Sequence, residues 1–235
     1  MKDANADIIT TMSTPNFRFK QFTIWHDKCA MKVGTDGVLL GAWCPKGTRI
    51  LDVGTGSGLI ARMLMQRCPE AEVEGIDIDE AAVEQARENG VTAFCSSLQN
   101  WQGSYDLIVS NPPYFQNSLK NPDKSRQTAR HTDTLRYDEL IAHSARLLKE
   151  NGQLALILPA DAESEILQIA AQHALTCTRI TRVYSKESKP ARRVLLAFEM
   201  SRSRDLEMTT NTLVLEDEKG GRSAAYSNLC REFYL

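Results

Sequence analysis

The chain has 235 residues, of which 42% are hydrophobic, and a formal net charge of −2 at neutral pH. This length and composition suit one enzyme-sized domain with a sizeable core, and no run approaches the roughly 18 apolar residues that a membrane-spanning helix needs. The six cysteines form no Cys-x-x-Cys pair, so no metal site is expected, and the polar amino terminus, which lacks a signal-peptide core, predicts a cytoplasmic protein.

Apolar runs typical of strands alternate with helical patterns along most of the chain. This alternation predicts an α/β fold, with a doubly wound, Rossmann-like, mostly parallel sheet that also carries an antiparallel edge hairpin. The expected strands lie near residues 50–53, 72–77, 91–95, 106–110, 153–158, 178–184 and 193–199. The expected helices lie at about 58–67, 80–89, 137–149 and 161–173, the third ending at Asn151-Gly152.

Three stretches fall outside this alternation. Residues 1–20 are expected to be a partly disordered N-terminal segment that precedes a single domain over 21–235. The polar stretch from Asn117 to Asp133 is too long for a simple connector, so it is a candidate lid or contact segment. The tail contains a possible strand at 212–215, and its role is left open.

A glycine-rich loop, Gly54 to Gly58, follows the first predicted strand of the alternating region and leads into a helix. Glycines let a ligand approach the main chain, and the free N–H groups of the next helix favour an anionic group. Position 59 is Leu59 and no Gly-Lys-Ser/Thr ending follows, so the dinucleotide fingerprint and the P-loop are both disfavoured. Asp77 ends the next strand, where a carboxylate accepts two ribose hydroxyls.

The motif Asn111-Pro112-Pro113-Tyr114 directly follows another apolar run. The prolines remove two backbone donors and push Asn111 away from helical conformation, so its carboxamide and the Pro112 carbonyl would both accept from one NH2 group. Tyr114 would stack on a flat base, contributing about 1–3 kcal/mol. The same residues also suit an ordinary proline-rich turn that caps a buried strand.

In order and spacing, the glycine loop, Asp77 and the Asn-Pro-Pro-Tyr motif resemble class I S-adenosylmethionine-dependent methyltransferases that act on amino nitrogens. With the upstream run from Met31 to Trp43, the chain from about Phe17 to Phe198 is similar to bacterial tRNA adenine-N6 methyltransferases, which modify the adenine beside the anticodon of a valine tRNA. The resemblance implies one methyltransferase domain over 21–235 that uses S-adenosylmethionine and tRNA, with no metal and no obligate protein partner.

The resemblance also implies roles for individual residues. The catalytic positions would be Asn111, Pro112, Pro113 and Tyr114. The cofactor-binding positions would be Thr35, Asp36, Asp52, Gly54, Thr55, Gly56, Gly58, Asp77, Ile78, Ser97, Leu98 and Asn111. Asp36 suits equally well the N-cap of a helix beginning near Gly37. Many relatives have an acid beside the cofactor adenine where this chain has Ser97 and Leu98, so that contact is left open.

Basic residues gather in two segments. One runs from Arg179 to Arg204, and the other follows the Asn-Pro-Pro-Tyr turn. Phosphates bound there would bring a base to the turn, so RNA contacts are predicted. The predicted RNA-binding residues are Lys120, Lys124, Arg126, Arg130, Arg192 and Arg193. A solvated charged surface is the other interpretation.

Three other functions stay open. A protein glutamine-N5 methyltransferase uses the same turn, but such enzymes carry a helical N-terminal substrate domain, and only a short stretch precedes Ile50 here. An rRNA guanine-N2 methyltransferase also fits the turn. A non-catalytic RNA-binding or cofactor-sensing module would have to retain the glycine loop and Asn111 without using them.

Overall fold

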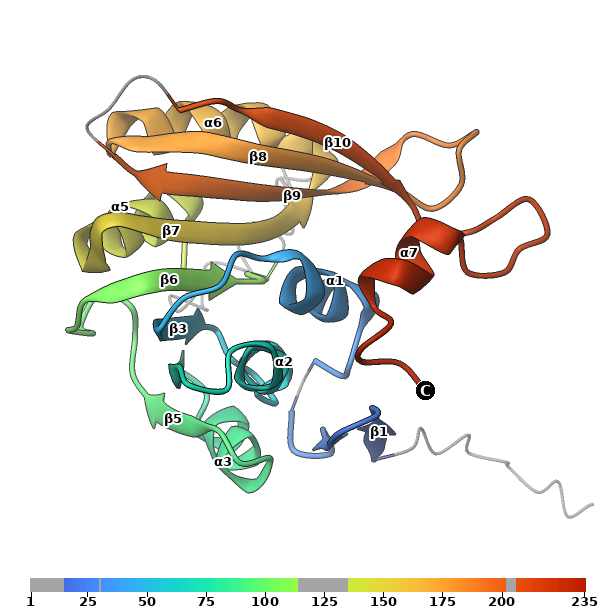
Figure 1. Ribbon diagram of the computed structural model, residues 1–235. Helices are drawn as coiled ribbons and strands as arrows, with labels where there is room; N and C mark the ends of the chain where they lie inside the picture. Colours follow the sequence, from blue (N-terminus) through green and yellow to red (C-terminus); the bar gives the residue numbers. More distant parts are fainter. Residues whose placement is uncertain (1–14, 30, 114–134, 202–205) are drawn as a thin grey trace, which may run out of the picture.

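The computed structural model describes residues 15–29, 31–113, 135–201 and 206–235 (Figure 1). The strands of its main sheet are β3 (Arg49–Val53), β4 (Glu72–Asp77), β5 (Thr92–Cys95), β6 (Tyr105–Ser110), β7 (Leu148–Pro159), β8 (Leu175–Tyr184), β9 (Ala191–Met200) and β10 (Thr209–Val214). Their order in space is β10-β8-β9-β7-β6-β3-β4-β5. Neighbouring strands are parallel except at β9, which runs antiparallel to β7 and β8.

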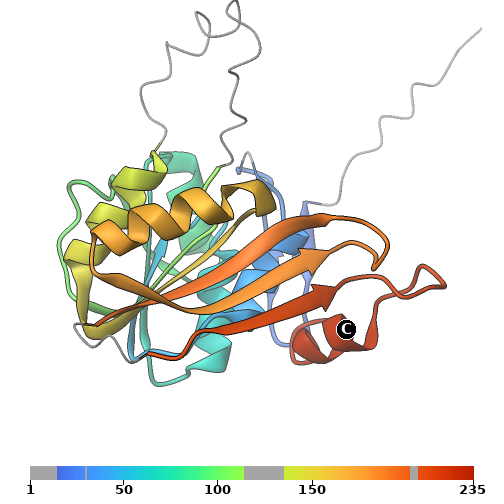
Figure 2. The same ribbon diagram turned by 90° about the horizontal axis from the view of Figure 1, so that it is seen from above.

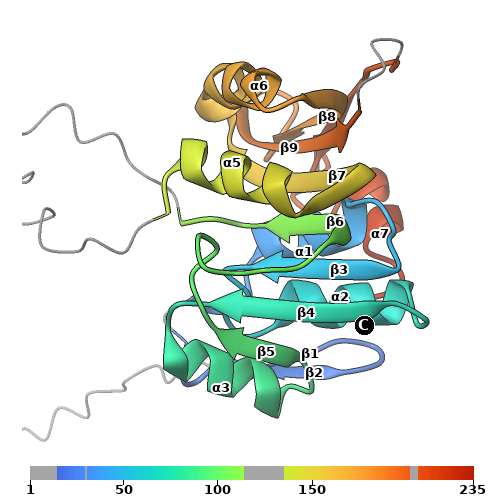
Figure 3. The ribbon, with the colours of Figure 1, turned by 90° about the vertical axis from the view of Figure 1, so that its left-hand side faces the viewer.

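Helices cover both faces of this sheet (Figure 3). The first face holds α1 (Thr35–Trp43), α2 (Leu59–Arg67), α3 (Glu80–Glu88) and α7 (Ala224–Leu229). The second face holds α5 (Tyr137–Leu147) and α6 (Glu163–Gln172), which lie side by side in Figure 2. A short 3-10 turn at Ala160–Ala162 precedes α6. This arrangement confirms the predicted α/β class.

Alternating side chains explain why the strands are apolar throughout. Ile50 belongs to the core on the α1 and α2 side, whereas the next residue, Leu51, belongs to the core on the α5 and α6 side. Leu107 and Ile108 divide in the same way on the neighbouring strand. Since successive strand residues point to opposite faces, a sheet covered on both sides needs apolar residues at every position.

The order of the strands changes direction between β3 and β6. From β3 the chain moves outward through β4 to β5, and it then returns to place β6 on the other side of β3. In doubly wound sheets, ligands bind beyond the carboxyl ends of the strands at such a switch point. Val53 at the end of β3 pairs with Ser110 at the end of β6. The glycine loop and the Asn111 turn therefore leave the sheet side by side.

The expected antiparallel hairpin is β8–β9, but it does not form the edge of the sheet. β10 extends the sheet beyond it, pairing parallel with β8 from Thr209, opposite Arg179, to Val214, opposite Tyr184. The sequence suggested this strand only at 212–215. The edge strand on this side of the sheet is therefore β10, built by the tail whose role the sequence left open.

The third predicted helix ends earlier than expected. α5 stops at Leu147, and β7 begins at once with Leu148. The register of β7 against β6 then shifts, and Asn151 has a φ of 60°. A Cβ on Gly152 would lie 2.9 Å from two backbone oxygens, so only glycine fits. Asn151 and Gly152 therefore form an irregularity within a strand, and the prediction that they end the helix was wrong.

The two ends of the described chain meet on the first face of the sheet. A small antiparallel hairpin, β1 (Asn16–Arg18) and β2 (Thr23–Trp25), precedes α1. The Phe19 ring lies 6.1 Å from the Tyr234 ring, and the Lys20 amide donates to the Phe233 carbonyl at 2.8 Å. The expected segment 1–20 thus contains a strand, while its residues 1–14 lie outside the described part of the chain.

Three further properties concern the described residues. None of their helices is long and apolar enough to cross a membrane. They also contain no cluster of three or more His, Cys, Asp or Glu side chains able to hold a metal ion. All six cysteines are free thiols, and four of them are buried.

Candidate active site

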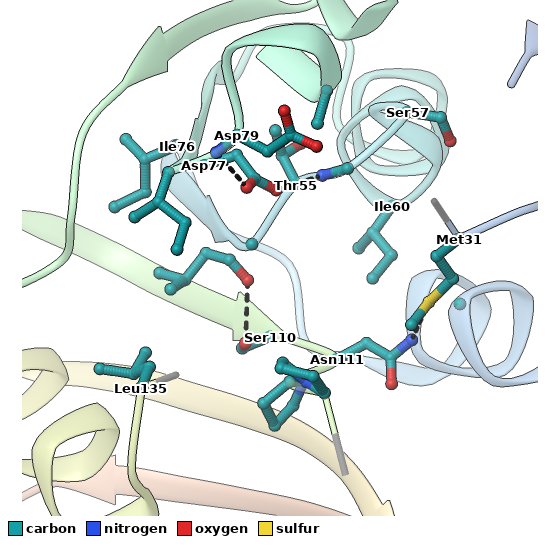
Figure 4. Close-up of a pocket in the computed structure, with 18 of the residues that line it drawn as sticks. Met31, Thr55, Ser57, Ile60, Ile76, Asp77, Asp79, Ser110, Asn111 and Leu135 are labelled. Atoms are coloured by element: carbon teal, nitrogen blue, oxygen red, sulfur yellow. Dashed lines mark hydrogen bonds between the residues drawn. The ribbon is translucent and has the colours of Figure 1, made fainter. Parts of the chain in front are cut away.

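A pocket of about 1150 Å³ opens at the carboxyl edge of the sheet (Figure 4). The loops that follow adjacent strands line it: Gly54 to Ser57 after β3, Asp77 to Asp79 at the end of β4, Ser96 to Gln99 after β5, and Ser110 to Pro113 at the end of β6. Because these strands are neighbours in the sheet, segments far apart in sequence converge here. The volume is large for a small-molecule site.

Residues 26–29 and 31–37 contribute a further part of the pocket lining, and we call this segment the N-terminal wall. Cys29, Met31 and Lys32 line the pocket from this wall, followed by the first turn of α1. Burial and the nearby carboxylates of Asp77 and Asp79 raise the pKa of the Cys29 thiol to about 11. The N-terminal wall therefore lies close to the end of β4.

The glycine loop exposes its main chain to the pocket. Gly54 and Gly56 have φ values of 69° and 54°, and a Cβ added to either would meet nothing within 4 Å. The Gly54 and Thr55 amides donate to the Ile76 carbonyl at 2.9 and 3.0 Å, which ties the loop to β4. A ligand is thus able to approach the backbone at Gly54 and Gly56, as the sequence predicted.

Gly58 differs from the other two glycines because it does not line the pocket. Its φ is 79°, and a Cβ there would lie 2.8 Å from Val91 Cγ2 and 3.3 Å from Ala86 Cβ. The predicted cofactor contact is therefore replaced by a packing role: the missing side chain lets α3 and the residues after it approach the glycine loop.

We expect Gly58→Ala to lower the free energy of unfolding by about 2–5 kcal/mol, because it adds left-handed backbone strain and a steric clash. Gly54→Ala carries similar strain but no clash, so it should cost only about 1–2 kcal/mol while obstructing the pocket. Denaturant unfolding of both variants checks the difference. Equal losses of stability would contradict the packing role of Gly58.

Asp52 is fully buried beneath the glycine loop and is absent from the pocket wall, so the predicted direct cofactor contact is not seen. Its Oδ2 accepts from the Thr55 hydroxyl at 2.8 Å and from the Ala61 amide at 3.2 Å. Its Oδ1 has no hydrogen-bond partner among the described residues. Burial raises the pKa of this carboxyl to about 7. Asp52 therefore joins the end of β3 to the loop and to α2.

The raised pKa predicts a pH-dependent stability. Between the ordinary pKa of 3.8 and about 7, the folded protein holds a proton on Asp52 that the unfolded chain has lost, so stability falls as the pH rises. An Asp52→Asn variant lacks this loss. The free energy of unfolding of this variant should therefore approach that of the parent protein by about 1 kcal/mol per pH unit between pH 5 and 7.

Denaturant unfolding at pH 5, 6 and 7 measures this slope. Asp106→Asn is the matched control, because a hydrogen bond from Lys149 lowers the pKa of Asp106 to about 2, below the tested range. The Asp106→Asn difference should stay constant across these pH values. A constant difference for Asp52→Asn as well would show that Asp52 is ionised in the folded protein.

Both carboxylate oxygens of Asp77 are held by backbone donors at the pocket wall. Oδ2 accepts from the Gly56 amide and Oδ1 from the Asp79 amide, each at 3.0 Å. These bonds fix the carboxylate beside the glycine loop (Figure 4). Asp77 thus lines the pocket, and its ribose contact stays a prediction.

The three positions expected near a cofactor adenine all line the pocket. Ile78 follows β4 with 53% of its surface exposed, and Ser97 and Leu98 follow β5. The Ser97 carbonyl accepts from the Asn100 and Trp101 amides, so this turn is fixed by its own backbone. Ile78 and Leu98 give this part of the pocket the apolar surfaces that a flat ring needs.

Asn111 and the two prolines lie where β6 ends, on the far side of the pocket from Asp77 (Figure 4). The buried Ser110 hydroxyl donates to the Val53 carbonyl at 2.8 Å and holds the ends of β6 and β3 together. The Asn111 amide nitrogen lies 3.9 Å from the Met31 sulfur. The Asn111 side chain is thus within the pocket and touches the N-terminal wall.

Several predicted residues lie outside the described part of the chain. They are Tyr114 and the expected RNA contacts Lys120, Lys124, Arg126 and Arg130, together with the candidate lid over 117–133. Their roles therefore stay predictions.

Arg193 lies in the pocket wall, a position that the sequence did not indicate. Its Nε donates to Asp36 Oδ2 at 2.9 Å, so an ion pair joins β9 to α1. Because β9 runs antiparallel, its first residues lie at the carboxyl edge, with Arg193 opposite Pro159. α1 begins at Thr35 with Gly34 as its N-cap, so the N-cap interpretation of Asp36 was wrong.

The basic segment after Arg179 is largely paired within the fold. The Arg179 guanidinium lies 3.7 Å from the Trp43 ring centre, and Arg182 donates two hydrogen bonds to the Glu163 carboxylate. Lys186 lies 3.4 Å from Glu216. Arg192 is exposed, so its predicted RNA contact stays a prediction.

Comparisons with known proteins agree with this geometry. The model of the methyltransferase small domain family matches residues 37–177. A protein of Bacteroides fragilis named tRNA1(Val) (adenine(37)-N6)-methyltransferase is 44% identical, over 95% of this chain and 99% of the relative. Proteins with the same name from Parabacteroides distasonis and Aeromonas hydrophila are 45% and 43% identical, over 95% and 93% of this chain and 99% and 97% of the relatives.

Solved structures share the fold at low sequence identity. A predicted O-methyltransferase from Agrobacterium tumefaciens has a TM-score of 0.67 and is 18% identical, covering 84% of this chain and 96% of that chain. A geranyl diphosphate C-methyltransferase from Streptomyces coelicolor A3(2) has a TM-score of 0.50 at 14% identity, covering 69% of this chain and 73% of that chain. At these identities the likeness concerns the fold alone.

Proposed function

The chain belongs to the tRNA1(Val) (adenine(37)-N6)-methyltransferase family, and from this premise we propose that it transfers a methyl group from S-adenosylmethionine to N6 of the adenine 3'-adjacent to the anticodon of a valine tRNA. The observation that carries the proposal is that Asn111 shares one pocket with the glycine loop and Asp77. Cytoplasmic location and a single domain over 21–235 are part of the same proposal.

The described residues fit S-adenosylmethionine. Gly54 and Gly56 leave space in which a bound methionine group would lie, since side chains at these positions would enter that space. The Asp77 carboxylate is oriented to accept ribose hydroxyls, and Ile78 and Leu98 provide apolar surface for an adenine ring. When bound, this cofactor supplies an electrophilic sulfonium methyl group.

Asn111 and Pro112 are proposed to orient the target amino group. The N6 lone pair of adenine is delocalised into the ring, which makes it a poor nucleophile. If the Asn111 carboxamide oxygen and the Pro112 carbonyl each accept one N6 hydrogen, the lone pair is freed to face the methyl donor. The proton leaves N6 after the new C–N bond has formed, so no general base has to act first. Positioning of this kind supplies up to about 7–11 kcal/mol of a barrier.

The RNA contacts complete the proposal. An adenine in an anticodon loop is already unpaired, so moving it into the pocket costs less than extruding it from a duplex. Tyr114 is proposed to stack on it. The residues proposed to bind the phosphates are Lys120, Lys124, Arg126, Arg130, Arg192 and Arg193. Their charge reversal should weaken tRNA binding and reduce its salt dependence.

The test is methyl transfer from labelled S-adenosylmethionine to RNA, and separately to protein, from cells lacking this gene, followed by nucleoside digestion. We expect label as N6-methyladenosine in valine tRNA, and none in a transcript with guanine at position 37. Label in guanosine or in a protein glutamine would overturn the substrate. Cofactor binding without any transfer would support a non-catalytic module.

A further inference from the structure

Two buried amide side chains beside the pocket have no part in the proposed reaction. Gln85 of α3 is 1% exposed, and Asn89, at the C-cap of the same helix, is 7% exposed. Neither residue lines the pocket. Burying an amide is unfavourable unless it is hydrogen-bonded, so its partners indicate what it holds in place.

Asn89 makes three hydrogen bonds to the main chain of two different segments. Its Oδ1 accepts from the Trp25 amide at 2.9 Å, and its Nδ2 donates to the Trp25 carbonyl at 2.7 Å. The same Nδ2 donates to the Ser57 carbonyl at 2.8 Å. Trp25 ends β2, directly before the N-terminal wall, and Ser57 lies in the glycine loop. One side chain therefore joins the end of β2, directly before the N-terminal wall, to the glycine loop.

Gln85, which lies one helical turn before Asn89, is hydrogen-bonded to the N-terminal wall. Its Oε1 accepts from the Lys28 amide at 2.9 Å, and its Nε2 donates to Glu88 at 3.2 Å. Residues four apart lie on the same face of a helix, so Gln85 and Asn89 act on neighbouring parts of one segment. Cys29, the residue after Lys28, is the first to line the pocket from this wall. Figure 3 shows β2 beside α3.

The packing at Gly58 makes this arrangement feasible. Because Gly58 lacks a Cβ, Ala86 and Val91 lie against the glycine loop. Asn89 lies between these two residues in sequence, close enough to reach Ser57. A larger residue at 58 would separate α3 from the loop and remove the link.

We propose that Asn89 and Gln85 are positioning residues that hold the N-terminal wall against the glycine loop and thereby set the affinity for S-adenosylmethionine without touching it. The inference rests on the proposed function. Without these bonds the observed arrangement of the wall would be only partly populated, and the apparent dissociation constant would rise as that population falls. The bound cofactor restores that arrangement, so turnover at saturation is retained.

Calorimetric binding of S-adenosylmethionine and S-adenosylhomocysteine without RNA tests the inference, together with steady-state kinetics and thermal unfolding. Gln85→Met, which keeps the side-chain length but loses the bond to Lys28, should raise both dissociation constants about tenfold. Asn89→Ala, which loses three bonds, should raise them by about a hundredfold. The KM for S-adenosylmethionine should rise in parallel, with kcat at saturation within about threefold of the parent.

Glu84→Gln is the matched control. Glu84 is exposed on α3 and lies 3.3 Å from the Lys28 ammonium, so the variant removes a surface ion pair but none of the backbone links. Its dissociation constants should be those of the parent.

The outcomes separate the two proposals. A parent protein that binds neither compound would overturn the proposed function. A parent that binds, with variants that lose thermal stability but keep their affinity, would overturn only the positioning role. A fall in kcat without a rise in the KM for S-adenosylmethionine would also overturn the positioning role. If Asn89→Ala does not fold, Gln85→Met decides the matter alone.

Discussion

Replacing Asn111 by alanine is expected to slow methyl transfer at saturating S-adenosylmethionine by about a hundredfold or more, with little change in stability. The side chain lies in the pocket at the end of β6, where Ser110 fixes the backbone by its bond to Val53. The turn should therefore survive the change. One of the two proposed acceptors for the target amino group would be lost, and the nucleophile would no longer be aligned.

Single-turnover kinetics with a valine tRNA transcript measure this effect, and calorimetry shows whether the cofactor still binds. Met31→Leu is the matched control: it changes the residue 3.9 Å from the Asn111 amide but leaves the proposed acceptors in place. Its rate should fall by no more than a few fold. If Asn111→Ala turned over as fast as the parent protein, the proposed orientation of the amino group would be refuted.

Removing the Asp77 carboxylate should weaken S-adenosylmethionine binding by about a hundredfold or more, because hydrogen bonds to a charged group contribute about 1.5–3 kcal/mol each. The carboxylate would accept the ribose hydroxyls, and it also holds the Gly56 and Asp79 amides. An Asp77→Ala variant therefore loses a ligand contact and one support of the glycine loop. Calorimetric titration provides the measurement.

The neighbouring Asp79 supplies the control. It also lines the pocket, but its Oδ1 accepts from the Ala81 amide as the N-cap of α3. Asp79→Ala should lower stability by about 1 kcal/mol and change the affinity by only a few fold. The assignment of the ribose to Asp77 fails if Asp79→Ala weakens binding as much as Asp77→Ala does.

The sequence predicted the positions of those pocket residues that are determined by short stretches of chain. Asp77 ends a predicted strand, and Gly54, Gly56 and Asn111 follow predicted strands. The carboxyl ends of parallel strands meet at one edge. Their convergence in one pocket thus follows from the order of the elements alone.

Other positions depend on pairings between distant segments. Arg193 reaches the pocket because β9 is reversed. The sequence predicted an antiparallel hairpin, but a basic residue near the start of a strand does not indicate that its side chain lines a pocket. Asn89 is buried and bonded to Trp25 and Ser57, and nothing in the local sequence at the end of the predicted helix 80–89 indicates these partners. The role of Gly58 likewise depends on Val91, whose position is set by the packing of α3.

The reversal of β9 also determines where the length of the chain is able to change without disturbing the sheet. The turn that joins Tyr184 to Ala191 lies at the same edge of the sheet as the pocket, on the side away from β4 and β5. Insertions in a hairpin turn leave the pairing of its strands intact, since register is held by the apolar residues of both faces. Changes of length in this turn are therefore able to reshape the surface at this edge while leaving the pairing of β3, β4 and β5 unchanged.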